Sequence, residues 1–442
     1  MCRAITGLHA NEARLDQSFD ERSMNRTQLL VLVLCGSVLF IDGFDAQAMG
    51  FVAPALVQQL HLARAALGPV FSSGLVGIMI GALVFGPLAD RIGRKPVLVW
   101  CTLLFGVFSL LTATAGSLQG LLLYRLFTGF GLGGAMPNAV ALTSEFMPER
   151  FRSTAVTVMF VGFALGAAAG GFVAAGLIPH FGWQSVFIAG GVAPCVIAVL
   201  LITFLPESTR FLQTGDARPS LIMGHGSKQF IVRQLFDRRR TRMTLLIWVI
   251  FFMSLLDLYF LNAWMPTLVH DAGIEIGRAI VLTALFQLGG AVGSFVLGRV
   301  LDRFLSFRVL AYAYLTAGVF VFLIGTAGKS VVLLACAILA AGCAVIGAQG
   351  GANALAAAFY PTPIRATGVG WALGIGRVGS IIGPLVGGVL LSFQKDTRRV
   401  FWAAAIPVLI ASAASFFASR AEPSRLAEQS LGSEQDIITP SS

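Results

Sequence analysis

Six ionisable side chains lie inside long apolar stretches of the sequence: Asp42, Asp45, Arg125, Glu145, Asp257 and Arg377. Asp42 and Asp45 are three residues apart, so they share one face if this stretch is a helix. Two carboxylates this close repel each other, and the repulsion favours a state in which one of them holds a proton. A group that takes up and releases a proton near ambient pH has the chemistry of a proton carrier.

The two arginines suggest complementary chemistry. Arginine stays charged in proteins, and its planar guanidinium offers paired donors that match a carboxylate. We expect one of Arg125 and Arg377 to hold an anion and the other to interact with a proton-carrying aspartate, with the assignment left open. Two alternatives remain: Asp42 or Asp45 is a fixed structural partner of Arg125, and Asp257 is a hydrogen-bond acceptor between helices.

Polar and aromatic residues near these charges are candidates for lining a binding site: Phe44, Asn138, Tyr259, Trp264, Gln349, Asn353 and Trp371. Aromatic faces suit a ring-bearing ligand. Each of these residues is equally suited to packing or bonding helices together. Glu145 lies close to the loop at residues 90–94, so we expect it to form a salt bridge there that closes one end of the site.

The stretches that carry these residues are typical of membrane helices. Of the 442 residues, 56% are hydrophobic and only 12% are charged. This composition excludes a soluble enzyme, a disordered chain and a disulfide-stapled secreted domain. An ionised side chain at bilayer depth costs about 2.5–3.5 kcal/mol, so the six charges should face partners or a wet cavity. The six cysteines form no CxxC pair, so we expect no disulfide or metal framework.

Twelve apolar runs are long enough to cross a bilayer, and they begin near Leu29, Leu67, Val97, Leu121, Thr154, Trp183, Met243, Ile280, Val309, Val331, Thr367 and Val400. With both termini in the cytoplasm, 23 Lys and Arg fall inside and 6 outside, as membrane topology favours. The net charge of +10 therefore indicates topology and not nucleic-acid binding. The predicted divisions are a cytoplasmic tail (1–27), a six-helix bundle (28–205), a cytoplasmic loop (206–242), a second six-helix bundle (243–418) and a cytoplasmic tail (419–442).

The two halves repeat each other at an offset of 212 or 213 residues. The matched segments are residues 86–91 with 298–303, residues 146–154 with 359–367, and Asp45 and Pro54 with Asp257 and Pro266. We therefore predict an all-α membrane protein of twelve transmembrane helices in two pseudo-symmetric six-helix halves. Similar halves in one orientation are typical of transporters that rock around a central site. A phosphate-loop motif is incomplete, because Leu323 stands where its first Gly is required, so uphill transport would need an ion gradient.

Several motifs resemble one transporter superfamily. GPLADRIGRKP at residues 86–96 resembles the signature loop of the major facilitator superfamily, and RLFTG at residues 125–129 resembles its fourth-span motif. DGFDAQAMGFVAPAL at residues 42–56 and YPTPIRATGVGWALGIGR at residues 360–377 are similar to its aromatic acid:proton symporter family. The resemblance covers residues 24–420.

The resemblance implies roles for particular residues. Asp42 and Asp45 would be needed for proton-coupled uptake, and Arg365 and Arg377 occupy family-like positions. The inner gate would include Asp90, Arg91, Gly93 and Arg94, together with the weaker second copy of that loop at Asp302 and Arg303. That copy lacks a glycine where Gly93 stands.

The implied function is import of an aromatic carboxylate, such as a hydroxybenzoate, by proton symport with alternating access. The expected location is a bacterial inner membrane, the energy source is the proton gradient, and no cofactor is needed. The expected partners are the aromatic acid, protons and the bilayer, with no nucleic acid and a monomer as the default. The alternatives are a superfamily transporter of a sugar, a non-aromatic carboxylate or a drug, and a membrane receptor for aromatic acids that does not transport.

Overall fold

The structure, a computed structural model, describes residues 24–207, 235–237, 240–304, 306–328, 330–393 and 396–421. Within these residues it contains helices and no strand. The long helices are α2 (Arg26–Gln59), α3 (Leu67–Ile92), α4 (Arg94–Ala113), α5 (Leu118–Phe146), α6 (Glu149–Phe181), α7 (Gln184–Phe204), α10 (Thr241–Asp271), α11 (Ile276–Arg303), α12 (Phe307–Thr326), α13 (Val331–Phe359), α14 (Thr362–Phe393) and α15 (Thr397–Ala421). A short 3-10 helix, η1 (Arg64–Ala66), precedes α3. The all-helical prediction is confirmed.

Of the described helices, eleven are long and apolar enough to cross a membrane, and α5 is the one long helix that falls short. Five glycines together with Arg125, Pro137 and Asn138 lower its hydropathy. The helix still packs against α2, α3, α4 and α6, and both Arg125 and Asn138 are buried. Its polar residues therefore face other helices and not lipid, which explains how a twelfth span can be less apolar than the rest.

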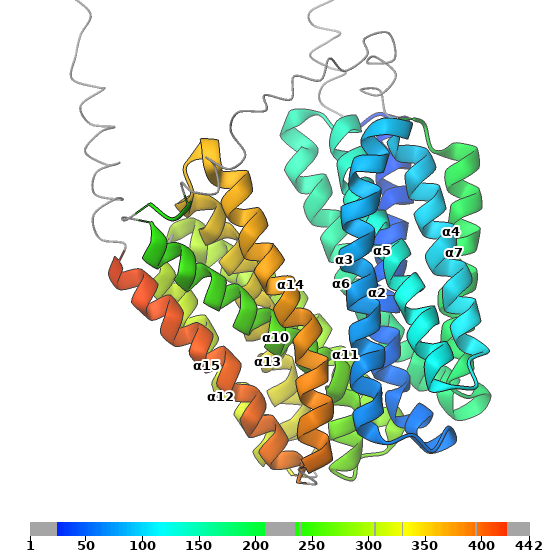
Figure 1. Ribbon diagram of the computed structural model, residues 1–442, viewed down its shortest axis with the longest axis vertical. Coiled ribbons are helices and arrows are strands. Elements are labelled where there is room, and N and C mark those ends of the chain that lie inside the picture. Colours follow the sequence, from blue (N-terminus) through cyan, green and yellow to red (C-terminus); the bar gives the residue numbers. More distant parts are fainter. Residues whose placement is uncertain are drawn as a thin grey trace, which may run out of the picture.

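The helices from α2 to α7 and from α10 to α15 form two groups with the same packing (Figure 1). In the first group α2 packs on α6, α3 on α5 and α4 on α7; in the second, α10 packs on α14, α11 on α13 and α12 on α15. Gly129 and Gly342, which are 213 residues apart, allow two of the close approaches between helices. A Cβ atom on Gly129 would collide with the carbonyl of Gly74, and one on Gly342 with that of Phe286.

The two groups approach each other at one end and separate at the other. In Figure 1 they converge at the lower end and diverge at the upper end. The main contacts between groups are those of α2 with α10, α3 and η1 with α14, and α6 with α11. We call the end where the two groups meet the closed end, and the other the open end. At the closed end Arg64 Nη1 lies 2.8 Å from Asp271 Oδ2, and Gln58 Nε2 lies 3.2 Å from His270 Nε2. A salt bridge and a hydrogen bond thus join the two groups at this end.

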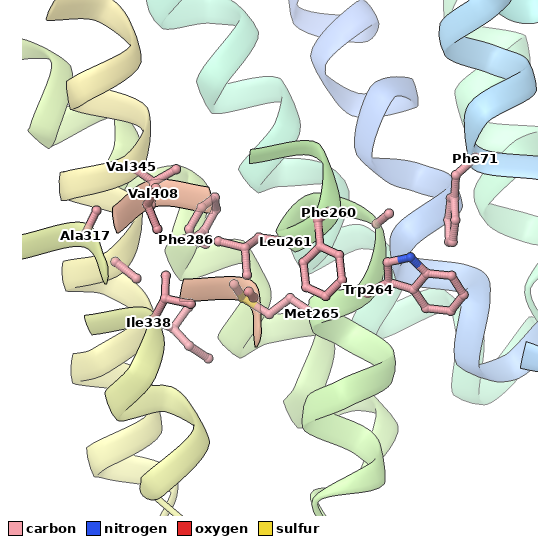
Figure 2. Packing of buried hydrophobic residues seen from close by; sticks show 14 of the residues in the cluster. Phe71, Phe260, Leu261, Trp264, Met265, Phe286, Ala317, Ile338, Val345 and Val408 are labelled. Carbon is pink, nitrogen blue, oxygen red and sulfur yellow. The ribbon is translucent and has the colours of Figure 1, made fainter. Parts of the chain in front are cut away.

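The apolar core of the second group reaches across this junction (Figure 2). The Trp264 ring meets the Phe71 ring edge-on, with 5.2 Å between centroids and 75° between planes. Trp264 Nε1 also donates a hydrogen bond of 2.9 Å to the Pro384 carbonyl. Near it, Ser72 Oγ donates a 2.7 Å hydrogen bond to the carbonyl of Ile381. The closed end is therefore a packed, mostly apolar contact between α3, α10 and α14.

Candidate functional site

A cavity of about 570 Å³ lies between the two groups of helices. Its wall comes from α2, α3, α5 and α6 on one side and from α10 and α14 on the other. Most lining side chains are apolar, including methionines and phenylalanines. Three charged side chains line it: Asp42, Arg125 and Arg377. A largely apolar wall with a few polar groups is typical of a site for a small organic molecule.

Asp45 and Arg125 form a buried ion pair. Arg125 Nη1 lies 3.1 Å from Asp45 Oδ2 and 3.2 Å from Oδ1, and Arg125 Nη2 donates to the Asp45 carbonyl at 3.4 Å. Asp45 is 0% exposed and Arg125 6%. Ser109 Oγ donates a 3.2 Å hydrogen bond to Asp45 Oδ1, and the guanidinium lies 5.7 Å from the Phe187 ring centroid. Each charge thus has a fixed partner.

Asp42 and Arg377 face the cavity from opposite groups. Asp42 lies on α2, one helical turn before Asp45, and it interacts electrostatically with both Asp45 and Arg377. Arg377 lies on α14, is partly exposed, and donates a 3.3 Å hydrogen bond from Nη1 to Tyr259 Oη. No carboxylate among the described residues forms a salt bridge with Arg377 within 4.0 Å. Arg377 is therefore the lining cation best placed to take an anion from the cavity.

Asp257, the repeat counterpart of Asp45, is in a different environment. It is 0% exposed, and neither carboxylate oxygen has a hydrogen-bond partner among the described residues. The repeat places Ala337 of α13 where Arg125 stands in α5, so the second half lacks the matching cation. Its neighbour is the buried hydroxyl of Tyr314, which is a neutral group. Asp257 does not line the cavity.

Six candidates for binding lie outside the cavity lining, and their binding roles stay predictions: Phe44, Asn138, Trp264, Gln349, Asn353 and Trp371. They lie outside it because most are used within the helix packing. Asn138 donates to the Gly134 carbonyl at 2.7 Å, Gln349 accepts a 2.5 Å hydrogen bond from Ser254, and Phe44 is buried beside Gly170 and Gly190. Trp371 is 45% exposed and stacks on Trp248.

Asn353, the remaining one of the six, is exposed on α13. Tyr259, Arg125 and Arg377 are the predicted binding residues that do line the cavity.

The predicted ion pair joins Arg94, the first residue of α4, to Glu145 near the end of α5. Arg94 Nη1 lies 2.6 Å from Glu145 Oε1. Gly93 has φ +101°, a conformation that L residues with a side chain rarely adopt, and a Cβ there would lie 3.1 Å from Glu207 Oε2. Glu207 Oε1 also accepts a 3.2 Å hydrogen bond from the Lys95 backbone N–H. Sequence reasoning missed Glu207. All these residues belong to the first group, so the pair does not join the two groups here.

The other predicted gate residues lie at the same open end. Asp90 and Arg91 are exposed at the end of α3. Arg303 is exposed at the end of α11 and lies over the Phe304 ring, while the side chain of Asp302 is outside the described part of the chain. Arg365 Nε donates a 3.2 Å hydrogen bond to the Tyr360 carbonyl. Their gating roles stay predictions.

The pairs at the closed end were also missed, although the sequence contained a signal for one of them. Gln58 and His270 are 212 residues apart, the offset of the repeat, and so are Gly50 and Asn262. A Cβ on Gly50 would lie 2.6 Å from the Asn262 carbonyl oxygen. Residues related by the repeat thus meet where the two groups touch, as they must near a pseudo-two-fold axis.

Comparison with known proteins agrees with this architecture. A model of the major facilitator superfamily matches residues 35–349 and 247–439. The 4-hydroxybenzoate transporter PcaK of Pseudomonas aeruginosa is 44% identical over 91% of this chain and 95% of its own length. A gallate transporter of Pseudomonas putida is 44% identical over 89% of this chain and 92% of its own length.

Solved structures show the same fold at low sequence identity. A bacterial homologue of the human lysosomal transporter Spinster, in an inward-facing and unoccupied conformation, has a TM-score of 0.74 and 17% identity, over 90% of this chain and 98% of that chain. A D-xylose–proton symporter has a TM-score of 0.72 and 17% identity, over 88% of this chain and 96% of that chain. The chain is therefore a multi-pass membrane protein and a transporter, and it belongs to the major facilitator superfamily.

Proposed function

We propose that this protein imports aromatic carboxylates of the hydroxybenzoate class by symport with protons. The observation that carries the proposal is the arrangement of charges around the cavity: Asp42 and Arg377 face the same space from opposite halves, while Asp45 is held by Arg125. The cavity is large enough for a benzene ring with its substituents and is mainly apolar. The similarity to transporters named for 4-hydroxybenzoate and gallate supports this substrate class.

The proton is coupled to the substrate through competition for Arg377. When Asp42 is ionised, its charge compensates Arg377 across the cavity. When Asp42 carries a proton, Arg377 is free to bind the carboxylate of the substrate with its paired donors. Loss of the proton on the other side restores the Asp42 charge and expels the anion. One proton and one monoanion together carry no net charge, so this cycle draws on the pH gradient alone; a second proton would add about 2.3 kcal/mol per 100 mV.

Asp257 is the candidate for that second proton. An ionised carboxylate buried without a partner costs several kcal/mol, so we infer that Asp257 is neutral in this conformation. It would release a proton only in a conformation that gives it water or a cation. Its role in coupling rests on the repeat and on this burial.

Alternating access follows from the two ends of the molecule. With both tails and the central loop in the cytoplasm, the open end faces inward, and the closed end faces the periplasm of a bacterial inner membrane. Residues 28–205 and 243–418 then form the two rocking bundles, and residues 1–27, 206–242 and 419–442 lie on the cytoplasmic side. The Arg94–Glu145 pair would meet the second half when the open end closes. The transporter works as a monomer, and the proton gradient is its energy source.

Replacing Arg64 by Gln is expected to shift the protein toward the outward-open state. The change removes the salt bridge to Asp271 that joins the halves at the closed end. Because Arg64 is 45% exposed, the pair contributes about 1 kcal/mol at most, which is about a fivefold change in the equilibrium. Pulsed spin-label distances across this end measure the shift. Arg278→Gln is the matched control, because its partner Glu275 belongs to the same half.

Uptake by proteoliposomes tests the function as a whole. Radiolabelled 4-hydroxybenzoate should accumulate when the outside is made acidic, and a protonophore should abolish the accumulation. Binding without accumulation would contradict transport and favour a receptor. Accumulation of a sugar or a drug in place of the aromatic acid would contradict the substrate class.

A further inference from the structure

One neutral polar side chain of the cavity has no role in the binding of the proton or of the substrate carboxylate proposed above. Among the described lining residues, the neutral polar side chains are Tyr259 and Asn262. The Tyr259 hydroxyl already accepts a hydrogen bond from Arg377. Asn262 is partly exposed and lies three residues further along α10, so the two side chains share one face of the helix.

A buried neighbour fixes the orientation of the Asn262 amide. Gln287 on α11 is 6% exposed, and its Nε2 donates a 3.0 Å hydrogen bond to Asn262 Oδ1. The carbonyl oxygen of the amide is therefore engaged, and the amide nitrogen is turned away from Gln287. No described residue accepts a hydrogen bond from Asn262 Nδ2. Asn262 lines a mainly apolar cavity, and its two amide N–H groups have no acceptor among the described residues.

The backbone of Asn262 is held as firmly as its side chain. Its carbonyl oxygen lies against Gly50 of α2, where any Cβ atom would come within 2.6 Å. This contact belongs to the closed end, so Asn262 lies at the deep end of the cavity. Tyr259 lies one turn back toward the open end, at a separation of about 4.5 Å along the helix axis. The Arg377–Tyr259 pair and Asn262 therefore lie at different depths of the cavity.

We propose that Asn262 is a specificity residue that donates a hydrogen bond from Nδ2 to a hydroxyl group on the substrate ring, opposite the carboxylate held by Arg377. The proposal rests on the proposed function and adds to it the substituent that the site selects. Gln287 is a positioning residue, since it acts only by fixing the amide. The ring itself lies between apolar side chains such as Phe71 and Met49, which line the cavity.

The expected consequence is discrimination against rings that lack the hydroxyl. A site built around a donor disfavours an analogue without an acceptor, because the donor loses its water and gains no partner. The wild-type protein should therefore transport 4-hydroxybenzoate with a KM at least tenfold lower than that of 4-methylbenzoate. The methyl compound has nearly the same size and the same carboxylate, so only the hydrogen bond differs.

The test compares Asn262→Leu with the wild type in proteoliposomes. In the variant the KM for 4-hydroxybenzoate should rise at least tenfold, while that for 4-methylbenzoate stays the same or falls. Gln287→Leu should show the same trend with a smaller change, of about threefold, because the amide is then free to rotate. Gln119→Leu is the control, since Gln119 is exposed at the start of α5 outside the cavity lining. An unchanged preference in Asn262→Leu overturns the proposal.

The wild-type measurement keeps the test decisive if a variant does not fold. Equal KM values for 4-hydroxybenzoate and 4-methylbenzoate in the wild type would overturn the role of Asn262 while leaving proton-coupled uptake intact. Failure of the wild type to accumulate either acid would contradict the proposed function itself. The two failures are thus distinguished in one experiment.

Discussion

Asp42→Asn should abolish accumulation of 4-hydroxybenzoate against its gradient and leave substrate exchange intact. The asparagine is neutral at every pH, so it mimics protonated Asp42 and leaves Arg377 free for the anion. Substrate can then bind, be carried across and dissociate down its own gradient, but Asp42 no longer carries a proton with it. Proteoliposomes measure both activities: uptake driven by an imposed pH gradient should disappear, and exchange with preloaded unlabelled substrate should remain.

Asp45→Asn is the matched comparison and should fail for a different reason. Arg125 would be left as a buried charge without its partner, at a cost of about 3–5 kcal/mol. The variant should lose thermal stability in detergent, and exchange should be lost together with accumulation. The double variant Asp45→Leu with Arg125→Met removes both charges and should regain much of the stability. If Asp42→Asn still accumulated substrate, or if both single variants behaved alike, the division of roles between the two carboxylates would be wrong.

The sequence did not predict which of the two aspartates pairs with Arg125. The spacing of Asp42 and Asp45 correctly predicted two carboxylates on one face of a helix near an arginine. Yet three residues turn a helix by about 300°, so the two side chains still differ in direction by about 60°. That difference turns Asp45 to α5 and Asp42 to the cavity. Only the packing of α2 against α5 decides which carboxylate is fixed and which is free.

Two aromatic candidates, Trp264 and Trp371, lie outside the cavity lining for a related reason. Trp264 and Trp371 lie near charged positions in the sequence, but a tryptophan packs equally well into a helix contact or against lipid. Trp264 is buried in the junction between the halves (Figure 2). The position of each tryptophan along its helix indicates its depth in the membrane. The direction of its side chain depends on the neighbouring helices, which the sequence does not show.

The architecture was the more predictable part, because it rests on patterns that cover the whole chain. Apolar runs and the fixed offset between halves predicted the helices and their order, and the structure confirms the all-helical fold. The same offset contained further information, since Gly50 with Asn262 and Gln58 with His270 are repeat partners that touch. The repeat therefore supplies candidate contact pairs near a pseudo-two-fold axis, and the structure shows which of them touch. Arg64 with Asp271 has no such signal in the sequence.

Arg377→Lys is expected to weaken substrate binding by at least about tenfold while the protein folds normally. Lysine keeps the positive charge, so the electrostatic attraction for an anion and the balance with Asp42 remain. What disappears is the planar fork that gives two parallel hydrogen bonds to a carboxylate, and a charge-assisted hydrogen bond contributes about 1.5–3 kcal/mol. Equilibrium binding of 4-hydroxybenzoate in detergent and the KM for uptake should both report the loss.

Two controls separate this loss from a general effect of the substitution. Arg278→Lys makes the same chemical change on an exposed residue outside the cavity and should leave binding unchanged. Tyr259→Phe removes the hydroxyl that accepts from Arg377 and should weaken binding by a few-fold, because the guanidinium is then less well oriented. Near-normal affinity in Arg377→Lys would remove Arg377 from the binding site. The anion would then have to bind Arg125, the other lining cation, whose guanidinium is already bonded to Asp45.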